Sequence, residues 1–221
     1  MNTLTKLALG LVGQLKLAPP SGDLHAGLPL PSPRMTGGAP LMDVLRRRHS
    51  SHEFLPDELP PQMLSDLLWA AFGINRLDSG GRTAPSALNA QEIDIYLALP
   101  EGLFLFDARR HELRPVVSQD VRRATGYQDF VDSAPLDLIF VADHSRMKRV
   151  PASKRSSYAS VAAGAISQNI YLFCASSGLA TVARAWFDRS ALASAMGLGP
   201  EQQILLTQTV GYPKPVAAAT P

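Results

Sequence analysis

The segment 46–54 holds three successive arginines followed by two histidines and two serines, including Arg48, His49, Ser50 and His52. A guanidinium can direct two N–H groups at the oxygens of a phosphate, and a serine hydroxyl can add a further bond. The segment therefore suits a phosphate group. Basic residues at a helix end also favour the negative end of the helix dipole, so a solvated helix terminus is the alternative interpretation.

A second candidate segment, 82–91, combines small residues with amides, and its members of interest are Pro85, Ser86, Asn89 and Gln91. Small side chains let a planar ligand approach the backbone, and each amide offers both donors and acceptors. An ordinary polar turn before the following strand explains the same residues. The local sequence leaves both interpretations open.

Two later segments add a possible wall and a possible cation. Residues 178–188 run as a strand that ends in Arg184, Trp186 and Phe187, which could offer backbone groups and an apolar surface to a ring. Lys214 follows a Gly-Tyr-Pro turn and could meet an anion. A core tryptophan and a surface lysine are the plainer explanations.

Hydrophobic periodicity predicts the elements that must position these segments. Helical spacing predicts helices at 40–47, 61–72, 158–176 and 190–196, with a short one at 120–125. Alternating or continuous apolar runs predict strands at 93–99, 102–106, 111–117, 136–142, 179–183 and 204–210. This order places helices first, then an antiparallel meander, then a long helix between strands, which is typical of the α+β class.

Composition excludes several classes of protein. The 221 residues suit one globular domain, and a net charge of +2 gives no concentrated basic face for nucleic acid. Cys174 is the single cysteine and no histidine shows metal-ligand spacing, so we expect no disulfide and no metal site. Residues 4–17 predict an amphipathic docking helix or a frayed arm, and no run is long enough for a membrane span. We expect a cytoplasmic protein.

The order and spacing of these segments resemble the FMN-dependent nitroreductase family. Residues 48–54 match its Arg-x-Ser-x-(Arg or Lys)-x-Phe segment, and 85–91 match its Pro-Ser-x-x-Asn-x-Gln segment. Its Gly-Leu-x-Thr-Val strand followed by an aromatic-Asp pair is similar to 178–188, and its Gly-Tyr-Pro turn to 211–213. The Leu-Leu-Trp-Ala-Ala-Phe-Gly-Ile-Asn sequence at 67–75 is most similar to the branch of SagB-like and thiazoline-oxidase-like dehydrogenases.

The resemblance implies a nitroreductase-like fold: a central, mostly antiparallel sheet wrapped by helices, in an intertwined homodimer. It implies an FMN-binding domain at 41–216. The prolines and glycines of 18–40 predict an extended arm, so 1–40 is expected to be an N-terminal extension with a proline-rich arm, and 217–221 a tail. NAD(P)H would reduce the flavin, which would then reduce a small-molecule acceptor such as a nitroaromatic or quinone in a ping-pong reaction.

The same resemblance assigns roles to individual residues. Arg48 and Ser50 would hold the FMN phosphate and ribityl chain, together with His49 and with help from Lys214. Pro85, Ser86, Asn89 and Gln91 would line the isoalloxazine, and the backbone of Arg184 and Ala185 would lie near flavin N5. His52 stands where the family usually has Arg or Lys, so its charge depends on pH. No side chain is expected to be catalytic.

Two other functions fit the same segments. One is a substrate-specific flavin dehydrogenase, such as an azoline oxidase for a modified peptide, which returns electrons to oxygen. The other is a flavin-binding protein without useful turnover, motivated by His52 and by the few residues that follow the Gly-Tyr-Pro turn. Oxidation of NADPH with a nitroaromatic acceptor distinguishes these from the first function.

Overall fold

The computed structural model describes residues 3–11, 17 and 27–215. Part of the predicted proline-rich arm and the predicted tail lie outside these residues. In the described part, the predicted docking helix is α1, Thr3–Leu11. No helix there is long and apolar enough to cross a membrane.

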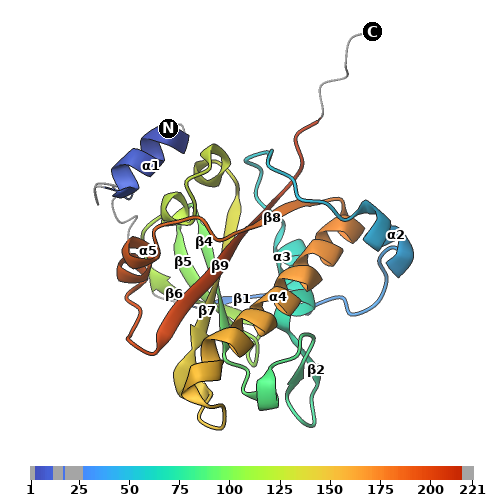
Figure 1. Cartoon of the computed structure of the whole chain (residues 1–221). Helices are drawn as coiled ribbons and strands as arrows, with labels where there is room; N and C mark the ends of the chain where they lie inside the picture. The colour runs from blue at the N-terminus through green and yellow to red at the C-terminus, as the bar shows by residue number, and fades with distance from the viewer. Residues whose placement is uncertain (1–2, 12–16, 18–26, 216–221) are drawn as a thin grey trace.

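The centre of the molecule is a sheet of seven strands in the order β1-β6-β5-β4-β7-β9-β8 (Figure 1). Every neighbouring pair is antiparallel, which confirms the predicted α+β class and its antiparallel sheet. The strands are β1 Leu28–Pro29, β4 Ile93–Leu99, β5 Gly102–Asp107, β6 Glu112–Val117, β7 Leu136–Asp143, β8 Ala180–Arg184 and β9 Gln202–Gly211. The predicted meander is β4-β5-β6.

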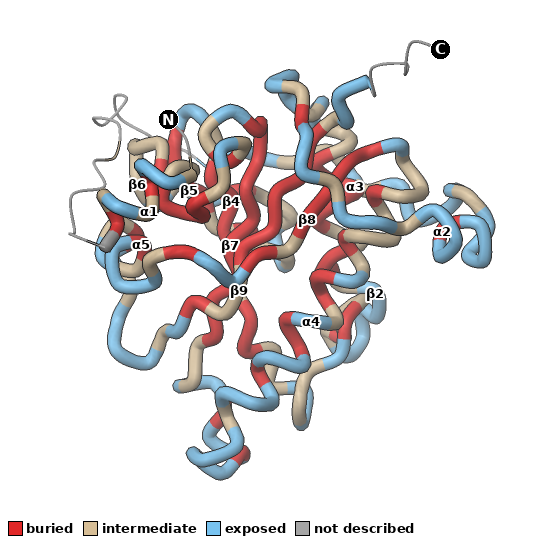
Figure 2. Tube along the Cα trace, turned by 45° about the horizontal axis from the view of Figure 1, so that its top comes forward, coloured by how far each residue is buried: buried red, intermediate tan, exposed pale blue. Residues whose placement is uncertain are grey.

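Alternation along the strands divides the core into two halves. Because successive side chains of a strand point to opposite faces, Leu138 and Phe140 of β7 face one side while Ile139 and Val141 face the other. The first half packs on α3, Pro61–Phe72, and α4, Ala152–Ser177. The second half packs on α5, Arg189–Met196, and on the 3-10 turn η2, Arg122–Ala124. Both faces of β7 are therefore buried, as its apolar sequence predicts (Figure 2).

The long helix α4 begins six residues before the predicted start at 158 and ends one residue after the predicted end. Its first turn is polar and follows the extended Pro151, so hydrophobic spacing gives no signal there. Cys174 lies in its buried face, and burial raises the pKa of the thiol. This position makes Cys174 a core residue, as predicted.

Helix α2, Leu41–Arg47, lies apart from the sheet and contacts α4 (Figures 1 and 2). It buries Val44, whereas Leu41, Met42 and Leu45 are exposed. Its outer surface is thus an apolar helix face without a partner in the described chain.

Helix α3 ends at Gly73, where the sequence predicts a C-terminal cap. The cap is extended, with φ −69° and ψ 166°, instead of left-handed. A Cβ atom at this position would lie 2.4 Å from the Trp69 ring and 2.6 Å from the Trp69 carbonyl oxygen. Close approach, and not a positive φ, is therefore what requires glycine here. The chain continues into a small hairpin of β2, Ile74–Arg76, and β3, Gly81–Arg82, which the sequence did not predict.

Candidate functional site

Arg48 and Ser50, which follow α2, both contact Tyr171 of α4. The Arg48 guanidinium lies 5.3 Å from the centre of the Tyr171 ring, and the Ser50 and Tyr171 hydroxyl oxygens are 2.9 Å apart. The Tyr171 hydroxyl also accepts a hydrogen bond from the Ala183 N–H of β8 at 2.8 Å. One tyrosine hydroxyl therefore joins the predicted phosphate-binding segment to the predicted flavin wall. Sequence reasoning did not find Tyr171, since nothing local distinguishes it from the other residues of this long helix.

The electrostatics of this corner suit an anion. Arg48 is half-buried and makes no ion pair among the described residues, so its charge is not neutralised by the protein. His49 is exposed, and its Nδ1 lies 2.8 Å from the Arg47 carbonyl oxygen. A guanidinium that stacks on a ring while its N–H groups stay available can bind a phosphate.

His52 and Lys214 form a second part of the same side of the molecule. A bridge between Phe54 and Pro213 brings the two segments together, and both residues line one shallow cavity. The His52 ring meets Phe130 edge-on at 5.9 Å. Both side chains are exposed. The late lysine predicted from sequence therefore lies next to the early histidine.

Arg184 turns its side chain away from this surface into the protein. It is buried, and it donates to Asp137 at 2.6 Å, to the Thr209 hydroxyl at 2.6 Å and to the Thr125 carbonyl at 2.8 Å. Burial raises the pKa of the Asp137 carboxyl and lowers that of Arg184, while the attraction between the two opposes both shifts. Ala185, the next residue, is exposed. The ion pair thus fixes the end of β8 from inside, while Ala185 and Trp186, which follow it, are exposed at the surface.

The segment 85–91 is a strained polar loop. Leu88, Asn89 and Gln91 have φ of 53°, 54° and 50°, a region that residues other than glycine adopt at a cost of about 1–3 kcal/mol each. The loop is braced by Gln91, whose N–H donates to the Ser86 hydroxyl and whose side chain bonds the Gly80 carbonyl and Arg82.

Pro85, Leu88 and Asn89 are the exposed members of the loop, and the side-chain oxygen Oδ1 of Asn89 accepts from the Gln91 side-chain amide at 3.1 Å. Strain of this kind is characteristic of functional sites. Gln91 therefore shapes the loop and is not a free donor.

The structure places the two halves of the predicted site at different ends of α4. Asn89 lines a cavity with residues 145–150, directly before α4 begins at Ala152. Tyr171, which contacts Arg48 and Ser50, lies nineteen residues after Ala152. This separation corresponds to a length of about 28 Å along α4 at 1.5 Å per residue. A single chain therefore does not bring Arg48 and Asn89 together.

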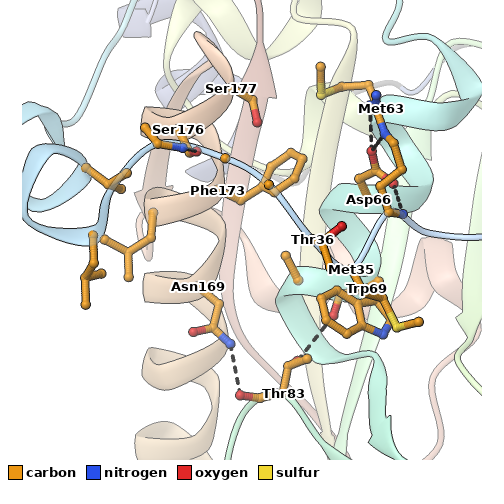
Figure 3. A pocket seen from close by; sticks show the side chains of 18 of the residues that line it. Met35, Thr36, Met63, Asp66, Trp69, Thr83, Asn169, Phe173, Ser176 and Ser177 are labelled. Carbon is orange, nitrogen blue, oxygen red and sulfur yellow. Dashed lines mark hydrogen bonds and ion pairs between the residues drawn. The ribbon is translucent and has the colours of Figure 1, made fainter.

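A cavity of about 760 Å³ lies between α3 and α4, and none of the predicted site residues lines it (Figure 3). Its floor is polar where Asn169 donates to the Thr83 carbonyl at 3.4 Å, and Trp69 and Phe173 form apolar walls. Asp66 holds Arg34 at its rim with an ion pair of 2.8 Å. Burial alone would raise the pKa of the Asp66 carboxyl, but N–H groups of Arg34 and Gln62 donate to it and the Arg34 charge attracts it, so its pKa is lowered. The two charged residues that line this cavity, Arg34 and Asp66, neutralise one another, so the cavity has no free cation comparable to Arg48.

Fold and site together describe a class of protein. It is an antiparallel α+β domain with available cations at one corner, which suit an anionic group, and a braced polar loop, which suits a planar one.

Comparison with known proteins identifies the particular family. Residues 45–212 match the model of the Nitroreductase family, and the chain belongs to this family. A Methanocaldococcus jannaschii protein provisionally named nitroreductase MJ1384 is 32% identical over 152 residues, 64% of this chain and 76% of that protein. Membership of the Nitroreductase family supports an oxidoreductase activity for this chain.

Solved structures agree with the family. A crystal structure provisionally described as a nitroreductase, from Ralstonia eutropha JMP134, is 46% identical with a TM-score of 0.86, and the match covers 91% of this chain and 96% of that one. The Escherichia coli microcin synthetase McbBCD complex shares the fold at 19% identity, with a TM-score of 0.69 over 76% of this chain and 70% of that one. A Desulfovibrio desulfuricans structure, solved in complex with FMN, matches at 19% identity and a TM-score of 0.59, over 84% and 94% of the two chains.

Proposed function

We propose that this protein is an FMN-dependent oxidoreductase that passes hydride from NAD(P)H to a small oxidised acceptor, such as a nitroaromatic or a quinone. The observation that carries the proposal is the placement of Arg48 and Ser50 against Tyr171, next to the end of β8, in a member of the Nitroreductase family. A distant structural relative solved with FMN supports the choice of flavin. When bound, FMN supplies the hydride transfer itself, accepting from NAD(P)H and giving to the acceptor in turn.

The residues at this corner fit the phosphate end of FMN. Arg48 has no ion pair among the described residues, and Ser50 exposes a hydroxyl beside it. Lys214 adds a cation on the same side, and the His52 ring lies beside it. These groups would bind the phosphate and ribityl chain, since Arg48 and Lys214 are both positively charged.

The end of β8 fits the role of a rigid wall. The buried Arg184–Asp137 pair holds the strand end in one position, so that the exposed backbone at Ala185 is a fixed surface for the flavin ring. Preorganised backbone groups of this kind orient a bound ring without reorganisation. Pro85, Ser86 and Asn89 would line the ring from another direction, with Gln91 holding their loop in shape.

We propose further that two chains complete each flavin site, because within one chain Asn89 lies by the segment before α4 and Arg48 lies at Tyr171, nineteen residues after the start of that helix. The exposed apolar residues Leu41, Met42 and Leu45 of α2, with Val161 of α4, are available to bury between two copies. The domain limits of 41–216 are part of the same proposal.

The first experiment is a visible absorption spectrum of the purified protein before and after anaerobic NADPH. We expect a yellow protein that releases FMN on denaturation and is bleached by NADPH. Arg48→Ala should lose FMN affinity, whereas Arg46→Ala, an exposed arginine already beside Asp43, should not. A protein that stays colourless after addition of FMN contradicts the proposal.

A complementation experiment tests the two-chain site. Arg48→Ala and Asn89→Ala chains are co-expressed with different tags and the mixed dimer is purified. If each site takes Arg48 from one chain and Asn89 from the other, the mixed dimer has one intact site and binds half the normal amount of FMN. Loss of both sites in the mixed dimer would show that each site belongs to one chain.

A further inference from the structure

A cavity of about 610 Å³ lies at the N-terminal end of α4, outside the groups that would hold FMN phosphate. Its walls are Leu88, Asn89 and Ala90 of the strained loop and residues 145–150 of the segment before α4. We call residues 145–150 the basic lip. No carboxylate belongs to these walls.

The basic lip is fixed in position by its own contacts. Asp143 caps the short 3-10 turn η4, His144–Arg146, by accepting from the Ser145 N–H at 3.0 Å. Met147 and Val150 are buried in the core. The lip is therefore an anchored structure and not a solvated loop that samples many positions.

Arg146 ties the lip to the strained loop. Its guanidinium donates to the Gln91 carbonyl at 3.0 Å and the Glu92 carbonyl at 3.2 Å, and it pairs with Asp94 at 2.5 Å and Asp143 at 3.3 Å. Two carboxylates neutralise its charge. Arg146 thus sets the distance between the lip and Asn89, and it leaves the other cations of the lip to act on a ligand.

Lys148 and Arg149 are these other cations. Both are exposed and both line the cavity, and neither makes an ion pair or side-chain hydrogen bond among the described residues. Two neighbouring cations with no protein carboxylate to neutralise them attract a dianion such as a phosphomonoester, and the arginine can bind it with two parallel N–H groups. The cavity is wide enough for more than a bare ion.

We propose that this cavity binds a phosphate group of the nicotinamide nucleotide donor, with Lys148 and Arg149 as the residues that recognise it. The inference rests on the proposed function, because it takes the donor from there. The assignment follows from position: the cavity shares Asn89 with the loop that would line the flavin ring, so a donor stacked on the ring could extend into it. The 2′-phosphate of NADPH and the diphosphate common to NADPH and NADH have the same chemistry, and the experiment separates them.

The test compares the wild-type holoprotein with the Lys148→Ala/Arg149→Ala variant. We expect the KM for NADPH to rise about tenfold with kcat changed less than twofold, since exposed cations contribute to binding equally before and during hydride transfer. An unchanged KM for NADH assigns the 2′-phosphate, and an equal rise for both donors assigns the diphosphate. The KM of the wild type for NADPH should also rise with salt, and this dependence should weaken in the variant.

A matched control removes the same charge elsewhere. Lys154→Ala/Arg114→Ala changes two exposed cations that do not line the cavity, and it should leave both KM values as in the wild type. The FMN dissociation constant is measured for each variant. An unchanged KM for both donors would overturn the proposal, because the lip would then bind no donor phosphate. Weaker FMN binding in the lip variant would also overturn it, because the lip would then bind the phosphate of FMN itself.

A binding measurement without turnover keeps this inference separate from the proposed function. Adenosine 2′,5′-bisphosphate is titrated calorimetrically into the holoprotein and the two double variants. Binding that the lip variant alone loses supports the phosphate site even if NADPH fails to bleach the flavin. Absence of wild-type binding to both this nucleotide and NADPH refutes the site. Bleaching of the wild type by NADPH with no effect of the lip variant refutes the site but leaves the proposed function intact.

Discussion

Removal of one hydroxyl, in Tyr171→Phe, tests whether α4 positions the phosphate-binding segment. The substitution keeps the aromatic ring that lies 5.3 Å from the Arg48 guanidinium and deletes the oxygen that Ala183 N–H and Ser50 share. It therefore separates the hydrogen bonds from the packing.

The expected loss of stability comes mainly from Ala183. Its N–H lies on the outer edge of the edge strand β8 and is half-buried, so it loses its partner at 2.8 Å with limited access to water. An unsatisfied buried donor costs about 1–3 kcal/mol of unfolding free energy. Because the Ala183 N–H is partly hydrated, we expect a cost of about 1 kcal/mol. Ser50 is exposed and water can replace its bond, so it adds little to the change in unfolding free energy.

Flavin affinity should respond as well. Without the shared hydroxyl, Ser50 and the end of β8 are no longer tied together, and a loss of about 1 kcal/mol corresponds to an approximately fivefold rise in the Kd for FMN. The assays are urea unfolding and a fluorescence titration of the apoprotein with FMN. Tyr158→Phe is the control, because this exposed tyrosine of α4 has no hydrogen bond among the described contacts. Wild-type FMN affinity in Tyr171→Phe would refute the positioning role, even if stability falls.

Three further predictions concern burial. Asp137→Leu should lower the free energy of unfolding in urea by about 3–5 kcal/mol, because it leaves Arg184 charged and unpaired. Adding Arg184→Met should recover part of that loss. If the losses of the two single variants simply add in the double variant, the reasoning is contradicted. Burial raises the pKa of Glu92 above its ordinary 4.5, so the folded state binds the extra proton and stability falls as pH rises from about 4.5 through the raised pKa. Glu92→Gln should remove this fall in the thermal midpoint, and an unchanged pH profile would count against it. Gly73→Ala should cost about 1–3 kcal/mol because its Cβ meets the Trp69 backbone, and a wild-type thermal midpoint would disprove that clash.

Most elements were predictable because their signals are local. Helix α3 was predicted with its observed bounds, since its apolar residues recur at helical spacing between a proline and a glycine. Strand β7 was predicted one residue short, from an apolar run that only a strand buried on both faces explains. The β2–β3 hairpin was missed because its strands have only three and two residues, too few to show a hydrophobic period.

The sequence by itself also supplied the family, because the spacing of its motifs is a property of the linear chain, and the family match bears this out. Only the tertiary structure decided which residues act on one another. Asp137 joins Arg184 across 47 positions and Tyr171 joins Ser50 across 121, and no local rule predicts pairs that depend on how the sheet stacks against α4. It also decided that Arg48 and Asn89 lie at different ends of that helix, since distance along a chain says nothing about direction in space.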